Sequence, residues 1–263
     1  MTVAEVFARC RDERRAALIP YLMAGDPSLE VTPALLAAAV AGGADIIEVG
    51  IPYSDPLADG PTIQAAAQRS LAGGTTFDAV LAMAAALDRS LVPVPLLAFT
   101  YYNPLFVRGV DRTAADLARA GFAGAIVPDL PPEEADELLA AFAAAGIGVT
   151  FLVAPTTPLA RVREIALVSS GFVYVVSRLG VTGAGRALSD NVEALVARLR
   201  PEVDKPLAVG FGVSTPEHAR AIAAFADGVI VGSALVDRIA RSPGREEAAV
   251  RDFCRSLADA VKR

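Results

Sequence analysis

Three carboxylates within one short stretch are the part of this sequence most suited to chemistry. Glu48 lies inside the apolar run DIIEVG, and Asp55 and Asp59 follow on the proline-rich loop PYSDPLADGP. Burying an unpaired carboxylate is costly, or else raises its pKa until the group keeps its proton. The pattern therefore predicts an acid–base site formed by Glu48 and a second carboxylate. Asp59, before Gly60, could equally be a turn residue, and Asp55 is better explained as a turn or cap before proline.

The elements that must position these groups can be read from alternating patterns along the chain. Continuously apolar runs predict strands, and Ala/Leu-rich segments between them predict helices. The predicted strands cover 18–24, 45–49, 95–100, 124–128, 148–153, 172–177, 206–211 and 228–232. The predicted helices cover 28–42, 61–89, 111–120, 132–145, 158–168, 189–200, 215–225 and 234–261. We expect Asp26-Pro27 to open the first of these helices, with Asp26 as its cap.

Eight strand-then-helix units in 263 residues predict a single (β/α)8 TIM barrel with extra helices, one domain over residues 1–263. An open doubly wound sheet is the alternative, but no G-x-G-x-x-G follows the first strand. In a barrel, Glu48 shares a strand face with Ile46 and Gly50, opposite Ile47 and Val49. No predicted strand offers a basic partner, so we expect Glu48 to point inward, near the mouth where barrel active sites lie.

Glycine-rich loops after the last three predicted strands indicate phosphate binding. Barrel enzymes often hold phosphate with the loops after strands seven and eight and a helix N-terminus. Gly212 follows the seventh strand, and Gly232-Ser233 follows the eighth and opens a helix. The loop LGVTGAG at 179–185, after the sixth strand, could be a closing lid or an ordinary connection.

Three aromatic residues are candidates for the substrate pocket. Tyr174 shares a strand face with Phe172 and Val176, and could line the site or belong to the core. Tyr21 and Phe211 are better suited to be apolar walls for an aromatic substrate than reactive groups.

Composition excludes several classes of function. The net charge is -6 without a basic block, so nucleic acid is not an expected partner. With His218 as the one histidine, a zinc site or a His-based triad is not expected. Cys10 and Cys254 are expected to be reduced thiols. The apolar stretches 90–107 and 138–160 are interrupted by turn residues, and the N-terminus lacks a signal-peptide pattern. We expect a cytoplasmic protein with no membrane span.

Seven segments run in order from about residue 18 to 240 and in phase with the predicted barrel: PYLMAGDP, EVGIPYSDPLADGPTIQ, YYNPL, PDLPPEE, SRLGVTG, GFGVSTPEH and VGSALV. Together they resemble the tryptophan synthase alpha subunit family. Tyr21 and Tyr53 depart from the family, because many relatives have phenylalanine there, and the lid VTGAGRAL looks shorter than in some.

The resemblance implies retro-aldol cleavage of indole-3-glycerol phosphate to indole and glyceraldehyde 3-phosphate. It makes Glu48 the acid–base, Asp59 the group that holds the indole N–H, and Tyr174 the site tyrosine. It implies phosphate contacts from Gly183, Gly212, Gly232 and Ser233. We place Tyr21, Tyr101, Phe211 and Thr182 in the substrate pocket and lid, with Thr182 on the loop that closes over Asp59.

The resemblance also implies a partner. A beta subunit that carries pyridoxal phosphate (PLP) would receive indole through a tunnel in an alpha2beta2 complex, and Asn103 and Asp129 would lie on loops that contact it. The alpha chain itself needs no cofactor and no metal. Three alternatives remain: a docking module that activates the beta subunit, a stand-alone indole-releasing lyase, and another phosphate-binding barrel enzyme. The absence of a lysine from the predicted strands disfavours a Schiff-base aldolase.

Overall fold

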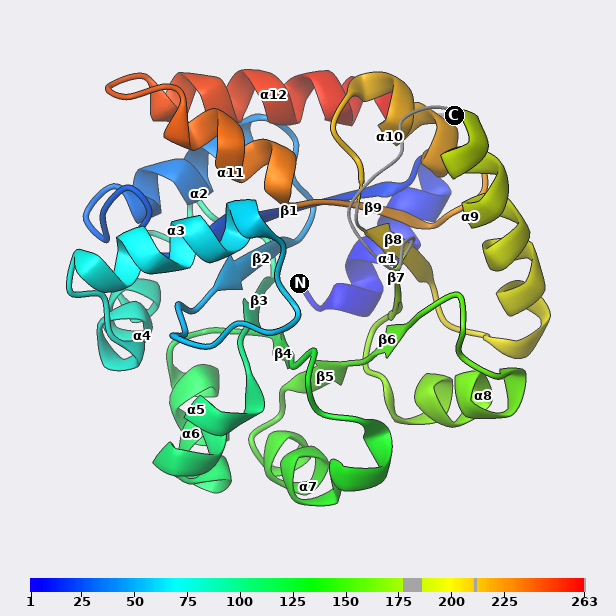
Figure 1. Ribbon diagram of the computed structural model, residues 1–263, viewed down its shortest axis with the longest axis horizontal. Coiled ribbons are helices and arrows are strands. Elements are labelled where there is room, and N and C mark those ends of the chain that lie inside the picture. The colour runs from blue at the N-terminus through cyan, green and yellow to red at the C-terminus, as the bar shows by residue number, and fades with distance from the viewer. Residues whose placement is uncertain (177–185, 211, 263) are drawn as a thin grey trace.

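A computed structural model describes residues 1–176, 186–210 and 212–262, without the side chains of 186–191. The described residues form nine strands, all paired in parallel, in a ring viewed end-on in Figure 1. They are β1 (Ala17–Met23), β2 (Ile47–Gly50), β3 (Leu96–Phe99), β4 (Gly124–Ile126), β5 (Gly148–Thr150), β6 (Leu152–Val153), β7 (Val173–Val176), β8 (Leu207–Gly210) and β9 (Gly228–Val231).

The ring closes because its two terminal strands are one stretch of chain. The sheet order runs from β5 through β1 to β6, and only Phe151 separates β5 from β6. The two short strands are therefore halves of the fifth barrel strand. Each of the eight predicted strands is present, so the predicted (β/α)8 barrel is confirmed.

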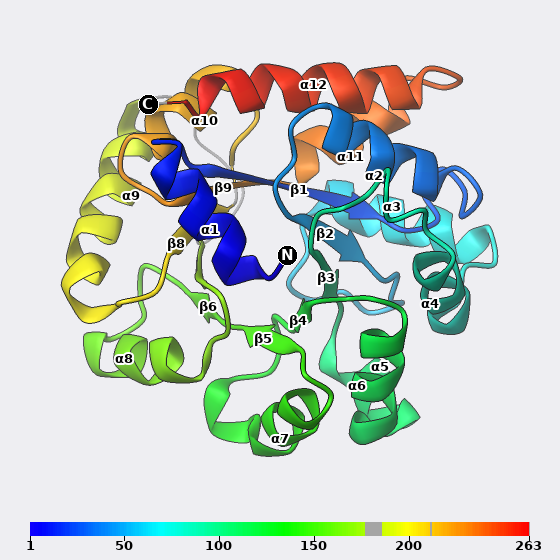
Figure 2. The ribbon, with the colours of Figure 1, turned by 180° about the vertical axis from the view of Figure 1, so that it is seen from behind.

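Helices surround the ring, as Figures 1 and 2 show. They are α1 (Val3–Asp12), α2 (Thr32–Ala41), α3 (Pro61–Ala72), α4 (Phe77–Ala85), α5 (Tyr102–Arg108), α6 (Val110–Arg119), α7 (Asp136–Ala144), α8 (Leu159–Val168), α9 (Arg186–Leu199), α10 (Pro216–Ala223), α11 (Ser233–Ala240) and α12 (Glu246–Ala260). Short 3-10 helices cover Pro132–Glu134 and Arg200–Glu202. Helix α1 crosses one open end of the barrel, in front of the strands in Figure 2.

Several helix boundaries differ from those predicted. The segment 61–89 is two helices, α3 and α4, separated at Gly73-Gly74, where Gly74 has φ 83°. The segment 234–261 is likewise divided into α11 and α12 by a turn that contains Pro243. The sequence analysis predicts extra helices but does not place α1 or α5.

The predicted role of Asp26 is wrong. Helix α2 begins at Thr32, with Val31 as its N-cap, so Asp26 caps no helix. Asp26 is instead 3% exposed and accepts two hydrogen bonds from Arg69 of α3, at 2.8 and 2.7 Å. A buried carboxylate needs such a charged, two-pronged partner. Asp26 therefore ties the loop after β1 to α3.

The core has two layers. Alternate strand residues such as Ile47 and Val49 pack outward against the helices. Residues such as Ile46, Ile19 and Phe99 fill the barrel interior. The interior cluster also includes Val6, Phe7 and Cys10 of α1 and residues of α3, so α1 closes the amino-terminal end of the barrel from below.

Candidate active site

Glu48 lies where the strand alternation predicted. Its neighbours Ile47 and Val49 face the helices, so Glu48 faces the barrel interior beside Ile46. The side chain is buried, and its Oε1 has no hydrogen-bond partner within the described part of the chain. Burial raises the pKa of Glu48 from 4.5 to about 8. At neutral pH Glu48 is therefore mainly a neutral acid, with a proton to donate.

Asp59 lies on the loop between β2 and α3, three residues after a turn residue, Pro56, whose carbonyl accepts its N–H at 3.2 Å. Burial raises the pKa of Asp59 to about 6, and a hydrogen bond from the Tyr101 hydroxyl opposes that rise. The Tyr101 hydroxyl also accepts the N–H of Ala58 at 3.0 Å. Asp59 is therefore mainly ionised at neutral pH. Two carboxyl groups held in opposite protonation states suit acid–base chemistry.

Two buried tyrosines lie within electrostatic reach of these carboxyl groups. Tyr21 and Tyr174 are buried in the barrel interior, and burial raises their pKa values. The negative charges of Glu48 and Asp59 raise these pKa values further. All four side chains are thus within electrostatic reach of one another. Tyr174 belongs to the interior apolar cluster and also lies within electrostatic reach of both carboxyl groups, so its role in the site stays a prediction.

Each tyrosine rests against a glycine of the next strand. A Cβ added to Gly50 would lie 2.1 Å from the Tyr21 hydroxyl, and one added to Gly210 would lie 2.4 Å from the Tyr174 hydroxyl. Only glycine leaves room for these rings. Sequence reasoning missed this role: Gly50 lies just after the predicted strand 45–49 and Gly210 just before the end of the predicted strand 206–211, and the observed strands β2 and β8 end at these glycines.

Three of the four predicted phosphate residues, Gly212, Gly232 and Ser233, follow the carboxyl ends of adjacent strands. Gly212 follows β8, and Gly232 follows β9, which pairs with β8. Gly232 is the N-cap of α11, and Ser233 is its first residue. The first N–H groups of a helix have no intrahelical partner and favour an anion. Thr182, Gly183 and Phe211, also predicted for the site, lie outside the described residues.

Asn103 and Asp129, the two residues expected to face a partner, lie at the carboxyl-terminal end of the strands, where Asp59 also lies. Asp129 accepts the N–H of Tyr102, at the start of α5, at 2.9 and 3.2 Å. Asn103 donates to the hydroxyl of Tyr53, on the loop that carries Asp59, at 3.2 Å. Both residues therefore join the loops around the candidate site.

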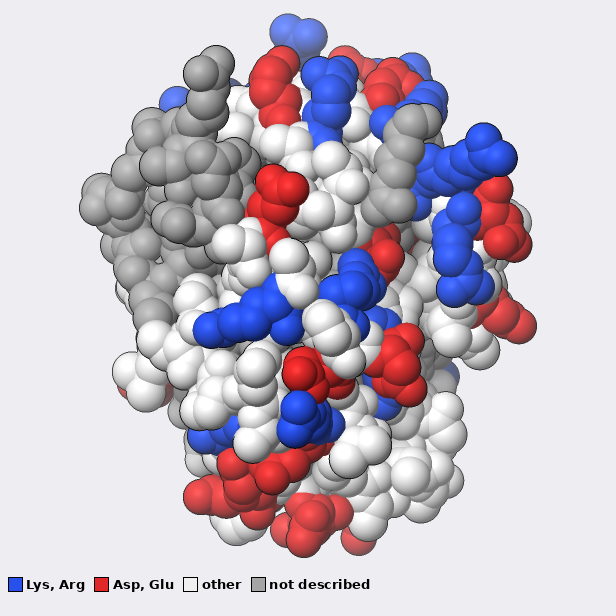
Figure 3. Space-filling model, turned by 90° about the vertical axis from the view of Figure 1, so that its right-hand side faces the viewer, with Lys and Arg blue, Asp and Glu red and all other residues white. Residues whose placement is uncertain are grey.

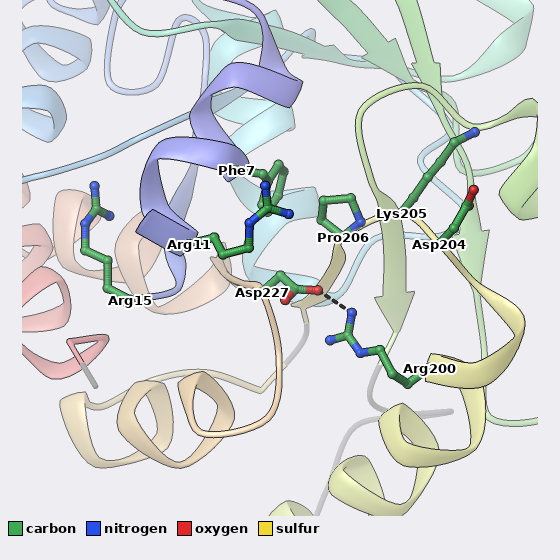
Figure 4. Close-up of a pocket in the computed structure, with 8 residues that line it drawn as sticks. All are labelled: Phe7, Arg11, Arg15, Arg200, Asp204, Lys205, Pro206 and Asp227. Atoms are coloured by element: carbon green, nitrogen blue, oxygen red, sulfur yellow. Dashed lines mark hydrogen bonds and ion pairs between the residues drawn. The ribbon is translucent and has the colours of Figure 1, made fainter. Parts of the chain in front are cut away.

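A cavity of about 130 Å³ lies at the other end of the barrel, before β1, β8 and β9 (Figure 4). Most of its basic side chains already have partners. Arg200 pairs with Asp227 at 2.6 Å, and Lys205 donates to three carbonyl oxygens. The side chains of Lys205 and Asp204 also point away from Arg11 in Figure 4. This cavity therefore lacks the features of the candidate site.

The side of the molecule that carries α8, α9 and α10 mixes charges of both signs (Figure 3). Arg163 pairs there with Glu202 at 2.5 Å. No cluster of metal-ligand type occurs among the residues described, and none of the described helices is long and apolar enough to cross a membrane. Cys10 and Cys254 are buried free thiols, whose pKa values burial raises to about 11 and about 12.

The fold and the two carboxyl groups at the barrel mouth have the features of a (β/α)8-barrel enzyme that performs acid–base chemistry. Residues 7–262 match the family described as tryptophan synthase alpha chain. The chain therefore belongs to the tryptophan synthase alpha chain family.

Individual relatives agree over the full length. The tryptophan synthase alpha chain of Cyanothece sp. is 52% identical over 99% of this chain and 98% of the relative. That of Chloroflexus aurantiacus is 47% identical over 99% and 98%. Among solved structures, a chain of tryptophan synthase from Mycobacterium tuberculosis superposes with a TM-score of 0.90 at 42% identity, over 99% of this chain and 98% of that one. The alpha subunit from Legionella pneumophila gives 0.91 at 35% identity over the same shares.

Proposed function

We propose that Glu48 and Asp59 carry out the lyase reaction of this family in the present chain. Family membership makes the chain a carbon–carbon lyase of tryptophan biosynthesis, as the sequence predicted. The substrate is indole-3-glycerol phosphate, and the products are indole and glyceraldehyde 3-phosphate. The observation that carries the residue roles is the pair of carboxyl groups, Glu48 buried and Asp59 half-buried, with pKa values of about 8 and about 6.

The two protonation states match the two halves of the reaction. Glu48, neutral at pH 7, donates its proton to C3 of the indole ring, which turns the ring into an electron acceptor. The resulting Glu48 carboxylate then removes the proton from the side-chain hydroxyl. The C–C bond breaks, its electron pair returns to the ring, and the aldehyde forms, which leaves Glu48 protonated again. Asp59, ionised, accepts a hydrogen bond from the indole N–H and stabilises the positive ring.

The rest of the site would hold the two ends of the substrate. The N-terminus of α11, with Gly232 and Ser233, and the neighbouring Gly212 would bind the phosphate, and we retain Gly183 as a further contact. Tyr21 and Tyr174 would flank the indole ring near both carboxyl groups. Thr182 and Phe211 keep their proposed places at the lid and pocket wall.

We further propose that a PLP-carrying beta subunit docks next to this end of the barrel. Contiguous apolar patches are uncommon on the surface of a monomeric protein, and exposed apolar side chains occur here on two adjoining segments. Leu57 of the Asp59 loop is 91% exposed, and Phe106 and Val107 of α5 are 60% and 75% exposed. The hydrogen bond between Asn103 and Tyr53 joins this loop to α5. The chain itself would need no cofactor. Two free thiols are in keeping with the cytoplasmic location that we propose.

The test is indole release from indole-3-glycerol phosphate by the purified chain, alone and with a beta subunit. Glu48→Gln and Asp59→Asn should each lower the rate, by about 10²–10⁴-fold for Glu48. Glu193→Gln, an exposed change on α9, is the control and should have no effect. Wild-type activity retained by Glu48→Gln would refute the assigned role.

The same assay separates the remaining alternatives. A cleavage rate that rises strongly when the beta subunit is added supports an alpha subunit that works in a complex. A rapid cleavage rate that does not change when the beta subunit is added supports a stand-alone lyase. A Glu48→Gln chain that still activates the beta subunit would show that docking and catalysis are separate roles.

A docking variant tests the partner surface. Phe106→Ser should weaken binding of the beta subunit, because a buried aromatic anchor is lost from the interface. Leu91→Ser is the matched control, since Leu91 is 59% exposed but precedes β3, at the opposite end of the barrel. Equal binding by both variants, measured by calorimetry, would remove α5 from the proposed interface.

A further inference from the structure

The position of the Asp59 carboxylate is set by a loop that has no regular secondary structure. Residues 51–60 lie between β2 and α3, outside any helix or strand. Within the loop, the backbone offers two short turns, Leu57 N–H to Asp55 at 2.9 Å and Asp59 N–H to Pro56 at 3.2 Å. A displacement of about 1 Å at a catalytic group can cost roughly 10²-fold in rate. Something besides these turns must therefore fix Asp59.

Two side chains from outside the loop hold the backbone on both sides of Asp59. The Gln64 side-chain amide donates to the carbonyl oxygen of Asp59 itself at 2.9 Å. The Tyr101 hydroxyl accepts the N–H of the preceding residue, Ala58, at 3.0 Å. The peptide group that follows Asp59 and the one that precedes Ala58 are thus held from two different elements.

Gln64 lies on α3, and hydrogen bonds hold this helix to the loop after β1. Gln64 lies in the first half of α3, and Arg69 and Ser70 in the second half bind the loop after β1. Arg69 forms its two hydrogen bonds with buried Asp26, and the Ser70 hydroxyl donates to the carbonyl of Ala24 at 2.6 Å. Helix α3 is therefore fixed to the barrel, and Gln64 transmits that position to Asp59.

Tyr101 is equally well anchored. It is 3% exposed and lies between β3 and α5. Its ring packs against Tyr53 with centroids 5.4 Å apart, and Asp129 holds the N–H of the next residue, Tyr102. Its hydroxyl also interacts with the Asp59 carboxyl group and lowers the pKa of that group.

We propose that Gln64 and Tyr101 are positioning residues that hold Asp59 where it accepts the indole N–H of the substrate. This inference rests on the proposed function and adds Gln64 to the residues on which the reaction depends. Gln64 would act without touching the substrate, through the backbone of Asp59.

A structural role and a positioning role for Gln64 make different predictions. Gln64 is only half-buried, so water can replace its amide at the Asp59 carbonyl and the fold loses little. The catalytic cost is larger, because the loop is then fixed from one side only. Loss of activity without a comparable loss of stability is therefore the expected signature.

The test is a double-mutant cycle on indole release by the isolated chain. Gln64→Leu should lower kcat/KM by about 10- to 100-fold in the wild-type background. In an Asp59→Asn background, assayed at high enzyme concentration, the same change should have no further effect, because the group it positions is gone. Gln68→Leu, one turn further along α3 and exposed, is the matched control and should match wild type.

Two further measurements keep the inference falsifiable if Asp59→Asn is too slow to assay. The melting temperature of Gln64→Leu should stay within about 2 °C of wild type, as expected for a surface change. Tyr101→Phe should move the acid limb of the pH–activity profile to higher pH, because its hydrogen bond lowers the pKa of Asp59, whereas Gln64→Leu should lower the rate without moving that limb.

Each failure has a distinct meaning. Full activity in Gln64→Leu, or an equal loss in both backgrounds, overturns the positioning role while leaving the lyase assignment intact. Full activity in Asp59→Asn overturns the proposed role of Asp59, and with it this inference.

Discussion

Replacing Glu48 with glutamine should make the fold less sensitive to alkaline pH. Burial raises the pKa of Glu48 from 4.5 to about 8. The folded protein therefore binds this proton more tightly than the unfolded chain does. The stability that results is fully present below about pH 4.5 and is lost as the pH rises through about 8.

The magnitude follows from the two pKa values. At roughly 1.4 kcal/mol for each pKa unit, the whole effect is about 5 kcal/mol, of which about 4 kcal/mol falls between pH 5 and pH 9. That is a large part of a typical free energy of unfolding of about 5–15 kcal/mol. Glutamine has almost the same shape but does not titrate, so Glu48→Gln should not show this loss.

The assay is urea unfolding of both proteins at a series of pH values. The cost of burying the glutamine amide is the same at every pH, and Asp59 titrates in both proteins, so neither contributes to the difference in slope. Wild type should lose about 4 kcal/mol more than Glu48→Gln between pH 5 and pH 9. Stability curves that run parallel would refute the claim that Glu48 is neutral in the fold.

Two further outcomes follow from the same geometry. The kcat/KM of the isolated chain should rise with pH through about 6, as Asp59 ionises, and fall above about 8, as Glu48 loses its proton; a flat profile from pH 5 to 9 would contradict both assignments. Gly210→Ala should destabilise the fold by about 1–3 kcal/mol and slow the enzyme, because its Cβ meets Tyr174; urea unfolding would check this against Gly73→Ala, whose nearest contact is an ordinary 3.4 Å.

Features that depend on local pattern were predictable from the sequence. The strands are apolar runs, and the alternation of Ile46, Glu48 and Gly50 with their neighbours gave the inward direction of the carboxylate. Helix α5 was missed because its segment, YNPLFVR, contains Pro104 and residues that favour strands. Pro104 is tolerated because it lies in the first turn, where its missing N–H has no intrahelical partner.

Features that join distant parts of the chain could not be derived from one sequence. Asp26-Pro27 has the composition of a helix start, and only Arg69, far along the chain, shows that Asp26 is an ion-pair partner instead. The contact of Gly210 with Tyr174 likewise requires the register of β7 against β8. The role predicted for a residue from its neighbours alone fails where a tertiary contact decides it.

Helix α1 has a consequence for how this protein should be handled. Its Phe7 packs on Phe172 with centroids 5.5 Å apart, and both belong to the apolar column inside the barrel. The same column holds Tyr21 and Tyr174 at the other end. A truncation at the amino terminus would thus admit water at that end of the barrel. Water would then lie closer to Glu48, and the pKa of Glu48 would fall toward its ordinary value. The first dozen residues therefore help to exclude water from the acid at the opposite end of the barrel.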